Sequence, residues 1–131
     1  SKSSYGVLRG VHLQKGEHAQ AKLVSCLEGK VWDVAVDLRK DSPTFGKWFG
    51  IELTPVNKLQ LYVPRGFGHG FSVLIETAVF AYKCDNFYCK DAEGSVIYND
   101  EVLKIDWKLP QEAIQLSDKD QNLPTFKEHN F

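Results

Sequence analysis

The sequence lacks several features that would assign it to a specialised class of protein. Neither sign of charge dominates, since 16 Lys and Arg residues stand against 17 Asp and Glu residues. This balance gives no bulk electrostatic case for binding nucleic acid or an anionic membrane surface. No stretch resembles a signal peptide or a membrane span. We therefore expect neither nucleic acid nor a membrane as a partner.

Cysteine is scarce and methionine is missing altogether. The three cysteines, Cys26, Cys84 and Cys89, are an odd number and lack the paired CxxC spacing of a zinc site. This usage fits a reducing compartment, so we expect a cytoplasmic protein. A newly translated chain begins with methionine, so we expect that residues 1–4 are not the native beginning and that residues upstream are missing.

The residues that are present predict one all-β domain over residues 1–131. A chain of 131 residues with 43% hydrophobic content can bury one core. Residues 31–38 and 58–63 alternate with a period of two, which is typical of half-buried strands. Further strands are expected at residues 6–14, 21–28, 47–53, 69–75 and 78–84. Short strands at this spacing predict a sandwich or barrel, with a short helix in residues 110–120.

Two segments combine basic and imidazole groups with glycines that let the backbone approach a ligand. Residues 6–14 contain Arg9, which could hold an anion, and His12, which could move a proton; residues 63–71 contain a further histidine. Arg9 and His12 point to opposite faces of a regular strand. They can serve one pocket if the strand bulges, as Gly10 would permit. By the same parity Lys22 and Tyr82 could both point into a barrel.

At this point the chain resembles the dTDP-4-dehydrorhamnose 3,5-epimerases, which act on nucleotide-linked 4-keto-6-deoxy sugars. The resemblance rests on eight segments in order, which together span nearly the whole chain. They are residues 6–14, 18–24, 34–39, 42–46, 64–71, 81–84, 105–107 and 116–120. It implies a cupin-type jelly roll, a homodimer, and an N-terminal nucleotide-binding segment upstream of the residues present.

The resemblance implies proton-transfer chemistry that needs no cofactor and no metal. A 4-keto group acidifies the hydrogens on C3 and C5, so a base can remove each proton and an acid can return it on the opposite face. By resemblance His12 is the base and Asp120 accepts its other ring N–H. Tyr82 is the proton donor, and Lys22 is the cation beside the ketone oxygen.

The resemblance also implies a set of substrate-binding residues for a dTDP-linked 4-keto-6-deoxy sugar. Arg9 is expected to contact the diphosphate, because a guanidinium can bond phosphate oxygens in pairs. His69 is expected to contact the sugar, and Gln14 to belong to the binding set. An aromatic residue from the pair Phe87 and Tyr88 is expected to stack on the thymine ring.

Three alternatives remain open at the level of sequence. Pro64-x-Gly66-x-x-His69 fits the second motif of metal-dependent cupins, although Lys22 replaces the metal-binding glutamate and His18 and His69 alone provide two imidazoles. A non-catalytic sugar-nucleotide binding module is a second alternative, since jelly rolls also serve as lectins. An epimerase that inverts a single centre, C3 or C5, is the third.

Overall fold

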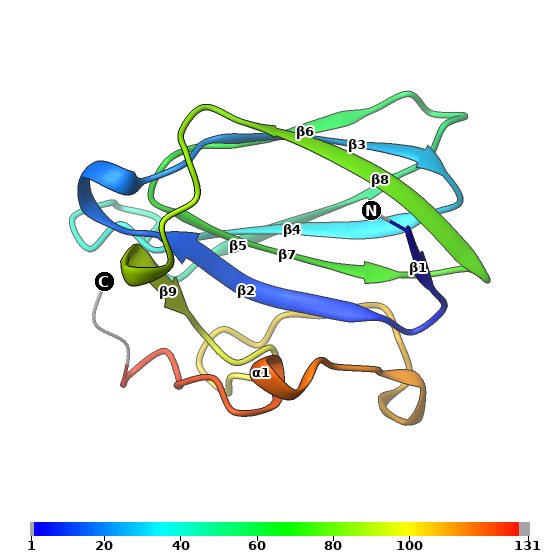
Figure 1. The fold of residues 1–131 in the computed structure, drawn as a ribbon. Helices are drawn as coiled ribbons and strands as arrows, with labels where there is room; N and C mark the ends of the chain where they lie inside the picture. Colours follow the sequence, from blue (N-terminus) through cyan, green and yellow to red (C-terminus); the bar gives the residue numbers. More distant parts are fainter. Residues whose placement is uncertain (1, 129–131) are drawn as a thin grey trace.

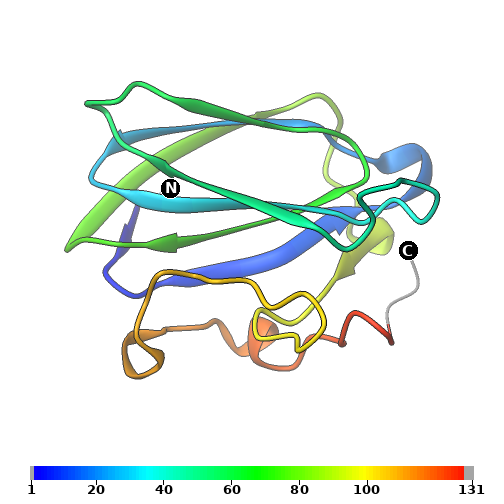
Figure 2. The same cartoon turned by 180° about the vertical axis from the view of Figure 1, so that it is seen from behind.

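A computed structural model describes residues 2–128 as two antiparallel sheets packed face to face (Figures 1 and 2). One sheet has the strand order β1-β8-β3-β6 and the other has the order β5-β4-β7-β2-β9. The strands are β1 (Lys2–Ser4), β2 (Leu8–Gln14), β3 (Lys22–Glu28), β4 (Val31–Asp37), β5 (Trp48–Leu53), β6 (Gln60–Val63), β7 (Phe67–Val73), β8 (Thr77–Cys84) and β9 (Glu93–Ser95). The prediction of an all-β jelly roll is confirmed. The three-residue strands β1 and β9 were not predicted, because they are too short to display a period of two.

The C-terminal tail contains two short helical elements in place of the single helix predicted for residues 110–120. They are a 3₁₀ helix, Gln111–Ala113, and α1, Asp118–Gln121; two further 3₁₀ turns are Gly16–His18 and Lys90–Ala92. Between Gln111–Ala113 and α1 the chain is extended. The Gln115 N–H donates to the Gly6 carbonyl at 2.8 Å, and the Gln115 carbonyl accepts from the Leu8 N–H at 3.0 Å. This pairing with the start of β2 prevents one continuous helix.

The first hydrophobic core lies between the two sheets. Inward-facing residues alternate along each strand, as in β3, where Val24 is fully buried and Cys26 is 6% exposed. The aromatic pair Phe71 and Phe80 joins the sheets, with ring centroids 4.2 Å apart in an edge-to-face arrangement. Polar residues lie beside this core, because Phe71 and Phe80 also line a hollow between the sheets.

A second core lies on the other face of the five-stranded sheet, where residues 96–126 cover it (Figure 1). Val34 and Val36 of β4 face this layer and are fully buried. Trp107 of the covering segment is anchored by its ring N–H, which donates to the Tyr98 carbonyl at 2.8 Å, while its own carbonyl accepts from Ser72 Oγ at 2.7 Å. The prediction that β4 is half-buried is therefore wrong, since the strand is covered on both faces.

The other strand predicted to be half-buried, β6, does have one exposed face. Leu61 and Val63 turn toward the core, while Gln60 and Tyr62 are exposed. The difference between β6 and β4 follows from their positions, because β6 is an edge strand of the sheet that has no covering layer. The layer that covers the five-stranded sheet, residues 96–126, consists of irregular chain. Such chain carries no periodicity that a sequence could reveal.

Candidate active site

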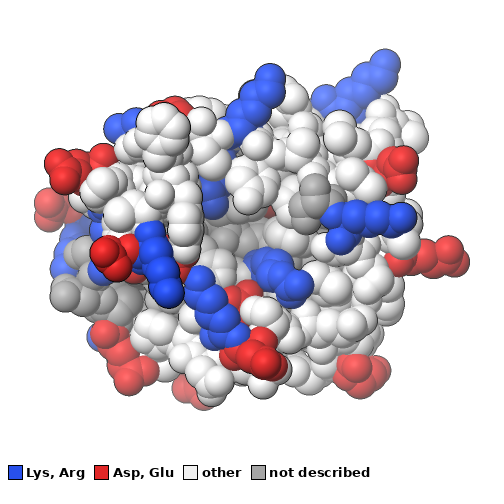
Figure 3. Space-filling model, in the orientation of Figure 1, with Lys and Arg blue, Asp and Glu red and all other residues white. Residues whose placement is uncertain are grey.

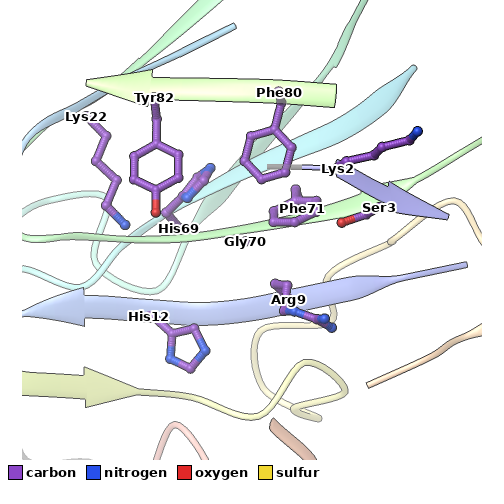
Figure 4. Close-up of a pocket in the computed structure, with 10 residues that line it drawn as sticks. All are labelled: Lys2, Ser3, Arg9, His12, Lys22, His69, Gly70, Phe71, Phe80 and Tyr82. Atoms are coloured by element: carbon purple, nitrogen blue, oxygen red, sulfur yellow. The ribbon is translucent and has the colours of Figure 1, made fainter. Parts of the chain in front are cut away.

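A hollow of about 350 Å³ opens between the two sheets at one end of the sandwich (Figure 4). On the space-filling view, Lys and Arg side chains lie around a depression on this face (Figure 3). The lining residues come from both sheets, including the edge strand β1. They are Lys2, Ser3, Arg9, His12, Lys22, His69, Gly70, Phe71, Phe80 and Tyr82. The sequence prediction named five of them as site residues: Arg9, His12, Lys22, His69 and Tyr82.

A bulge in β2 turns Arg9 and His12 toward the same hollow. Arg9 pairs with Phe71 and His12 pairs with His69, so three steps along β2 match two steps along β7. The bulge contains Gly10 with φ +133°, a conformation that other L-residues rarely adopt. A Cβ at Gly10 would also lie 2.7 Å from the Gly70 Cα. The strand therefore does bulge at Gly10, the condition under which Arg9 and His12 could serve one pocket.

Lys22 and Tyr82 project from the opposite sheet. Lys22 pairs with Cys84 across the β3–β8 ladder and Val24 pairs with Tyr82, so both side chains share the inner face. The Lys22 Nζ lies 5.6 Å from the centre of the Tyr82 ring. Burial lowers the pKa of Lys22 below its usual value, although the negative charges of Cys84 and Asp33 partly oppose this effect.

His12 forms a buried pair with Asp120, which is 108 residues away in the sequence. The ring Nε2 lies 2.8 Å from Asp120 Oδ1, and the Gly10 N–H donates to Asp120 Oδ2 at 3.1 Å. Asp120 is 1% exposed and lies in α1, whose first turn is capped by Ser117. Burial alone would raise the pKa of Asp120, but the bonds from His12 and Gly10 outweigh it and lower the pKa.

Because a carboxylate can only accept hydrogen bonds, His12 Nε2 carries the hydrogen and donates a hydrogen bond to Asp120. The ring Nδ1 then holds the lone pair that can accept a proton. The His12 side chain is 28% exposed, so its ring is reachable from the hollow that it lines. The expected return of the tail to the His12 strand is confirmed.

A second histidine–aspartate pair joins His69, which lines the same hollow, to Asp33, a buried residue that the sequence analysis missed. His69 Nε2 lies 2.6 Å from Asp33 Oδ1, with His69 7% exposed and Asp33 fully buried. Asp33 Oδ2 is buried and accepts no hydrogen bond from residues 2–128. Asp33 occupies an inward position of β4 between Val31 and Ala35. A charged residue at such an apolar position is the signal that could have identified it.

A second hollow of about 480 Å³ adjoins the first, and His12, Lys22 and Tyr82 line both. Phe87 and Tyr88, predicted as nucleobase contacts, line the second hollow and are 89% and 67% exposed. The hydroxyl of Tyr88 donates to one oxygen of Glu93 at 2.7 Å, and Lys119 Nζ donates to the other at 2.8 Å. Neither Glu93 nor Lys119 was predicted from the sequence.

Gln14, predicted to belong to the binding set, lines the second hollow, and its polar side-chain atoms bond the backbone of neighbouring segments. Its side chain is 5% exposed, and its amide oxygen and nitrogen bond the backbone of His18, Phe87 and Cys89. His18, considered as a metal ligand, lines neither hollow. Within the described part of the chain, no three His, Cys, Asp or Glu side chains are grouped so that they could hold a metal ion.

The fold and this geometry define the class of protein: two packed sheets that enclose a hollow, with a His–Asp pair on one wall and a tyrosine and lysine on the other. A family model described as dTDP-4-dehydrorhamnose 3,5-epimerase matches residues 1–128. The chain belongs to this family. The family prediction made from the eight sequence segments is therefore confirmed.

Individual relatives agree with the family assignment. The dTDP-4-dehydrorhamnose 3,5-epimerase of Salmonella typhimurium is 53% identical over 124 residues, covering 95% of this chain and 67% of that protein. The crystal structure of the Elizabethkingia anophelis epimerase has a TM-score of 0.98 at 72% identity, covering 100% of this chain and 72% of its own. A Legionella pneumophila 3,5-epimerase in complex with dTDP-4-keto-L-rhamnose has a TM-score of 0.93 at 49% identity, covering 98% and 67%. These relatives confirm the cupin-type fold.

In the described residues no helix is both long and apolar enough to cross a membrane.

Proposed function

We propose that this chain epimerises dTDP-4-dehydro-6-deoxy-D-glucose at C3 and C5 by proton transfer through an enolate, giving dTDP-4-dehydro-L-rhamnose. One observation carries the proposal: His12 and Tyr82 come from opposite sheets and line one hollow (Figure 4). Inversion of a carbon needs a base on one face of the sugar ring and an acid on the other. The names of the three relatives, all 3,5-epimerases, support the double inversion.

The base in this proposal is His12, oriented by Asp120. His12 Nδ1 accepts the proton from C3 or C5, and the electrons of the broken C–H bond form the double bond of the enolate. The resulting imidazolium is stabilised by the Asp120 carboxylate, whose Oδ1 lies 2.8 Å from Nε2. The Gly10 N–H bond to Oδ2 holds the carboxylate in place during the transfer.

The acid is Tyr82, which returns a proton to the same carbon from the opposite side. Its hydroxyl proton forms the new C–H bond, the enolate electrons restore the ketone, and the phenolate is reprotonated while His12 releases its proton to solvent. No electrons leave the substrate, so the reaction as proposed requires no redox cofactor. General acid–base catalysis of this kind is worth roughly 10²–10⁴-fold in rate.

Lys22 stabilises the negative charge that develops on the ketone oxygen. The Lys22 ammonium lies in the hollow beside the Tyr82 ring, and burial in this water-poor site strengthens its attraction for an oxyanion. His69 reaches the same hollow from β7 and is fixed in orientation by Asp33. We propose that its ring contacts the sugar near this oxygen.

The nucleotide is held by residues around the two hollows. We propose that the sugar occupies the first hollow and that the nucleobase lies against Phe87 or Tyr88 in the second. The diphosphate in this proposal is bound by Arg9, which lines the first hollow. The Arg9 guanidinium forms no ion pair with residues 2–128 and makes one hydrogen bond, to the Leu8 carbonyl at 3.3 Å. It is therefore available to an anion.

The test is incubation of the protein in D₂O with dTDP-4-keto-6-deoxyglucose, followed by NMR. The proposal predicts solvent deuterium at both C3 and C5 of an epimerised product. Deuterium at one carbon would contradict the double inversion and identify a single-centre epimerase. Absence of exchange, with tight dTDP binding, would contradict catalysis and identify a nucleotide-sugar binding module.

We further propose a homodimer in the cytoplasm. The dimer is supported by the family resemblance, and the location is supported by three cysteines that are all free, one of them exposed. Sedimentation equilibrium at micromolar concentration tests the dimer, since a mass near that of one chain, 14.9 kDa, would contradict it.

A further inference from the structure

The buried side chain of Gln14 directs two of its three hydrogen bonds to the segment that carries the exposed aromatic residues. Its Oε1 accepts a hydrogen bond from the Cys89 N–H at 2.8 Å. Its Nε2 donates to the Phe87 carbonyl at 3.0 Å and to the His18 carbonyl at 2.7 Å. Both amide protons and the amide oxygen are therefore satisfied within the protein, although Gln14 borders both the second hollow and a neighbouring one.

The same segment is held from its other end. Asn86 Nδ2 donates to the carbonyls of Glu17 and Ala19 at 3.1 and 3.3 Å. Gln20 Nε2 donates to the Asn86 carbonyl at 2.9 Å. Side-chain amides thus fix the backbone on both sides of residue 87, while the ring of Phe87 remains 89% exposed. A fixed backbone that presents exposed rings is a preorganised contact surface, since little freedom is left to lose on binding.

Gln14 also connects this surface to the proposed base. His12 and Gln14 are two residues apart on β2 and share one face of that strand, and both line the second hollow. If the segment containing Phe87 and Tyr88 shifts, the distance between this segment and His12 therefore changes, while His12 itself stays in place.

We propose that Gln14 is a positioning residue, which sets the aromatic pair Phe87 and Tyr88 at the distance from His12 that a nucleotide substrate requires. This inference rests on the proposed function and deepens it. It assigns affinity for the nucleobase end of the substrate to Gln14, a residue that takes no part in the proton transfer. It predicts that loss of the Gln14 amide weakens binding of ligands that contain a nucleobase. Ligands that contain only the diphosphate keep their affinity.

The experiment compares dTDP with inorganic pyrophosphate by titration calorimetry on the full chain. In Gln14→Leu we expect the Kd for dTDP to rise about 10-fold, since hydrogen bonds within the protein that fix the segment are lost. The Kd for pyrophosphate stays within about twofold of wild type. In turnover of dTDP-4-keto-6-deoxyglucose the KM rises by a similar factor and kcat changes less than about twofold.

Two further variants keep the test decisive. Asn86→Ala removes the other attachment of the segment and gives the same selective loss of dTDP affinity, so the inference does not depend on the folding of Gln14→Leu. Gln115→Leu is the matched control, because the exposed Gln115 also donates from Nε2 to a backbone carbonyl, that of Tyr5 at 2.7 Å, and lines neither hollow. This control retains wild-type Kd values for both ligands.

Equal weakening of dTDP and pyrophosphate, or unchanged dTDP affinity, in Gln14→Leu and Asn86→Ala would overturn the positioning role. Those outcomes leave wild-type turnover intact, so they differ from failure of the proposed function, which appears as absence of turnover in the wild type. A wild-type protein that fails to bind dTDP would overturn both.

Discussion

The site contains two histidine–aspartate pairs that look alike in isolation but differ in their surroundings. In the pair His12–Asp120 the histidine side chain is 28% exposed, and both carboxylate oxygens accept a hydrogen bond. In the pair His69–Asp33 the side chains are 7% and 0% exposed, and Asp33 Oδ2 accepts no bond from residues 2–128. The Nε2–Oδ1 distances are therefore similar, 2.8 and 2.6 Å, although the first pair is partly exposed and the second is buried.

The difference separates a group that moves protons from a group that shapes the local field. A base has to exchange its proton with substrate and solvent, which the partly exposed His12 can do and the buried His69 cannot do easily. A buried carboxylate with an unsatisfied oxygen is costly, and such groups persist where they serve a function. The charge of Asp33 reaches Lys22 and raises its pKa against the effect of burial, which keeps the ammonium charged beside the ketone.

The largest expected effect is that of His12→Asn, which removes the base and retains a side chain of similar reach. We expect kcat to fall about 10³–10⁴-fold, because the proton at C3 or C5 has no acceptor. Solvent deuterium exchange should be lost while dTDP binds with a Kd within about threefold of wild type. Turnover that survives this substitution would assign the base elsewhere.

Asp120→Asn tests the orienting partner of the same pair. The amide cannot stabilise an imidazolium and can impose the wrong tautomer on His12, so we expect kcat to fall about 10²-fold. The KM should change little, since Asp120 is 1% exposed and lines neither hollow. The measurement is steady-state kinetics, and an equal rise in KM would indicate a disturbed pocket rather than a lost orientation.

Asp33→Asn is the matched change in the second pair, and the comparison predicts a smaller effect. We expect kcat to fall about 10-fold, because His69 keeps its position less well and the Lys22 ammonium loses a nearby negative charge. The alkaline limb of the kcat profile should move to lower pH, since that charge raises the Lys22 pKa. A loss as large as that of Asp120→Asn would break the distinction between the pairs.

Asp37 is a third buried carboxylate that can be compared with Asp120 and Asp33, but its partner is an arginine instead of a histidine. It accepts bonds from Arg39, Ser42 and Thr44, and the Arg39 guanidinium, with the two hydroxyls, holds the Asp37 pKa far below its usual value. Asp37→Asn should leave kcat within about twofold. It should lower the free energy of unfolding by about 2 kcal/mol at pH 7, measured by urea denaturation.

The sign of the pH dependence follows from the lowered pKa of Asp37. Its contribution to stability is complete above the unfolded-state value of about 3.9 and is lost as the pH falls through the lower folded-state value. The gap in stability between wild type and Asp37→Asn is therefore widest near pH 5–8 and narrows below about pH 4. A gap that is constant from pH 7 down to pH 2 would contradict an ionic role.

The strands, and the side chains that share a face of the site, were predicted from the sequence better than the residues that hydrogen-bond to those side chains. Parity along β3 and β8 indicated that Lys22 and Tyr82 could point to one face, and Gly10 indicated where β2 could bulge. The pairing of His12 with Asp120 was available through the family resemblance alone, because 108 residues separate them.

Other features depend on tertiary contacts that leave no local pattern. Asp33 differs from an exposed aspartate because the other sheet covers its face of β4, and the sequence does not show which strands pack against that face. Gln14 was assigned to substrate binding, but the loop that it holds lies more than 70 residues away in sequence. Partners of this kind are set by which loops meet in space, so periodicity and propensity cannot reveal them.

The central claim is that base and acid act from opposite sheets, and Tyr82→Phe in D₂O tests it most directly. With His12 intact and the acid removed, the account predicts that deuterium enters the recovered substrate at C3 or C5 without inversion, while formation of the epimerised product falls about 10²-fold or more. Exchange and inversion that fall together to the same extent, or inversion that continues at the wild-type rate, would contradict the account.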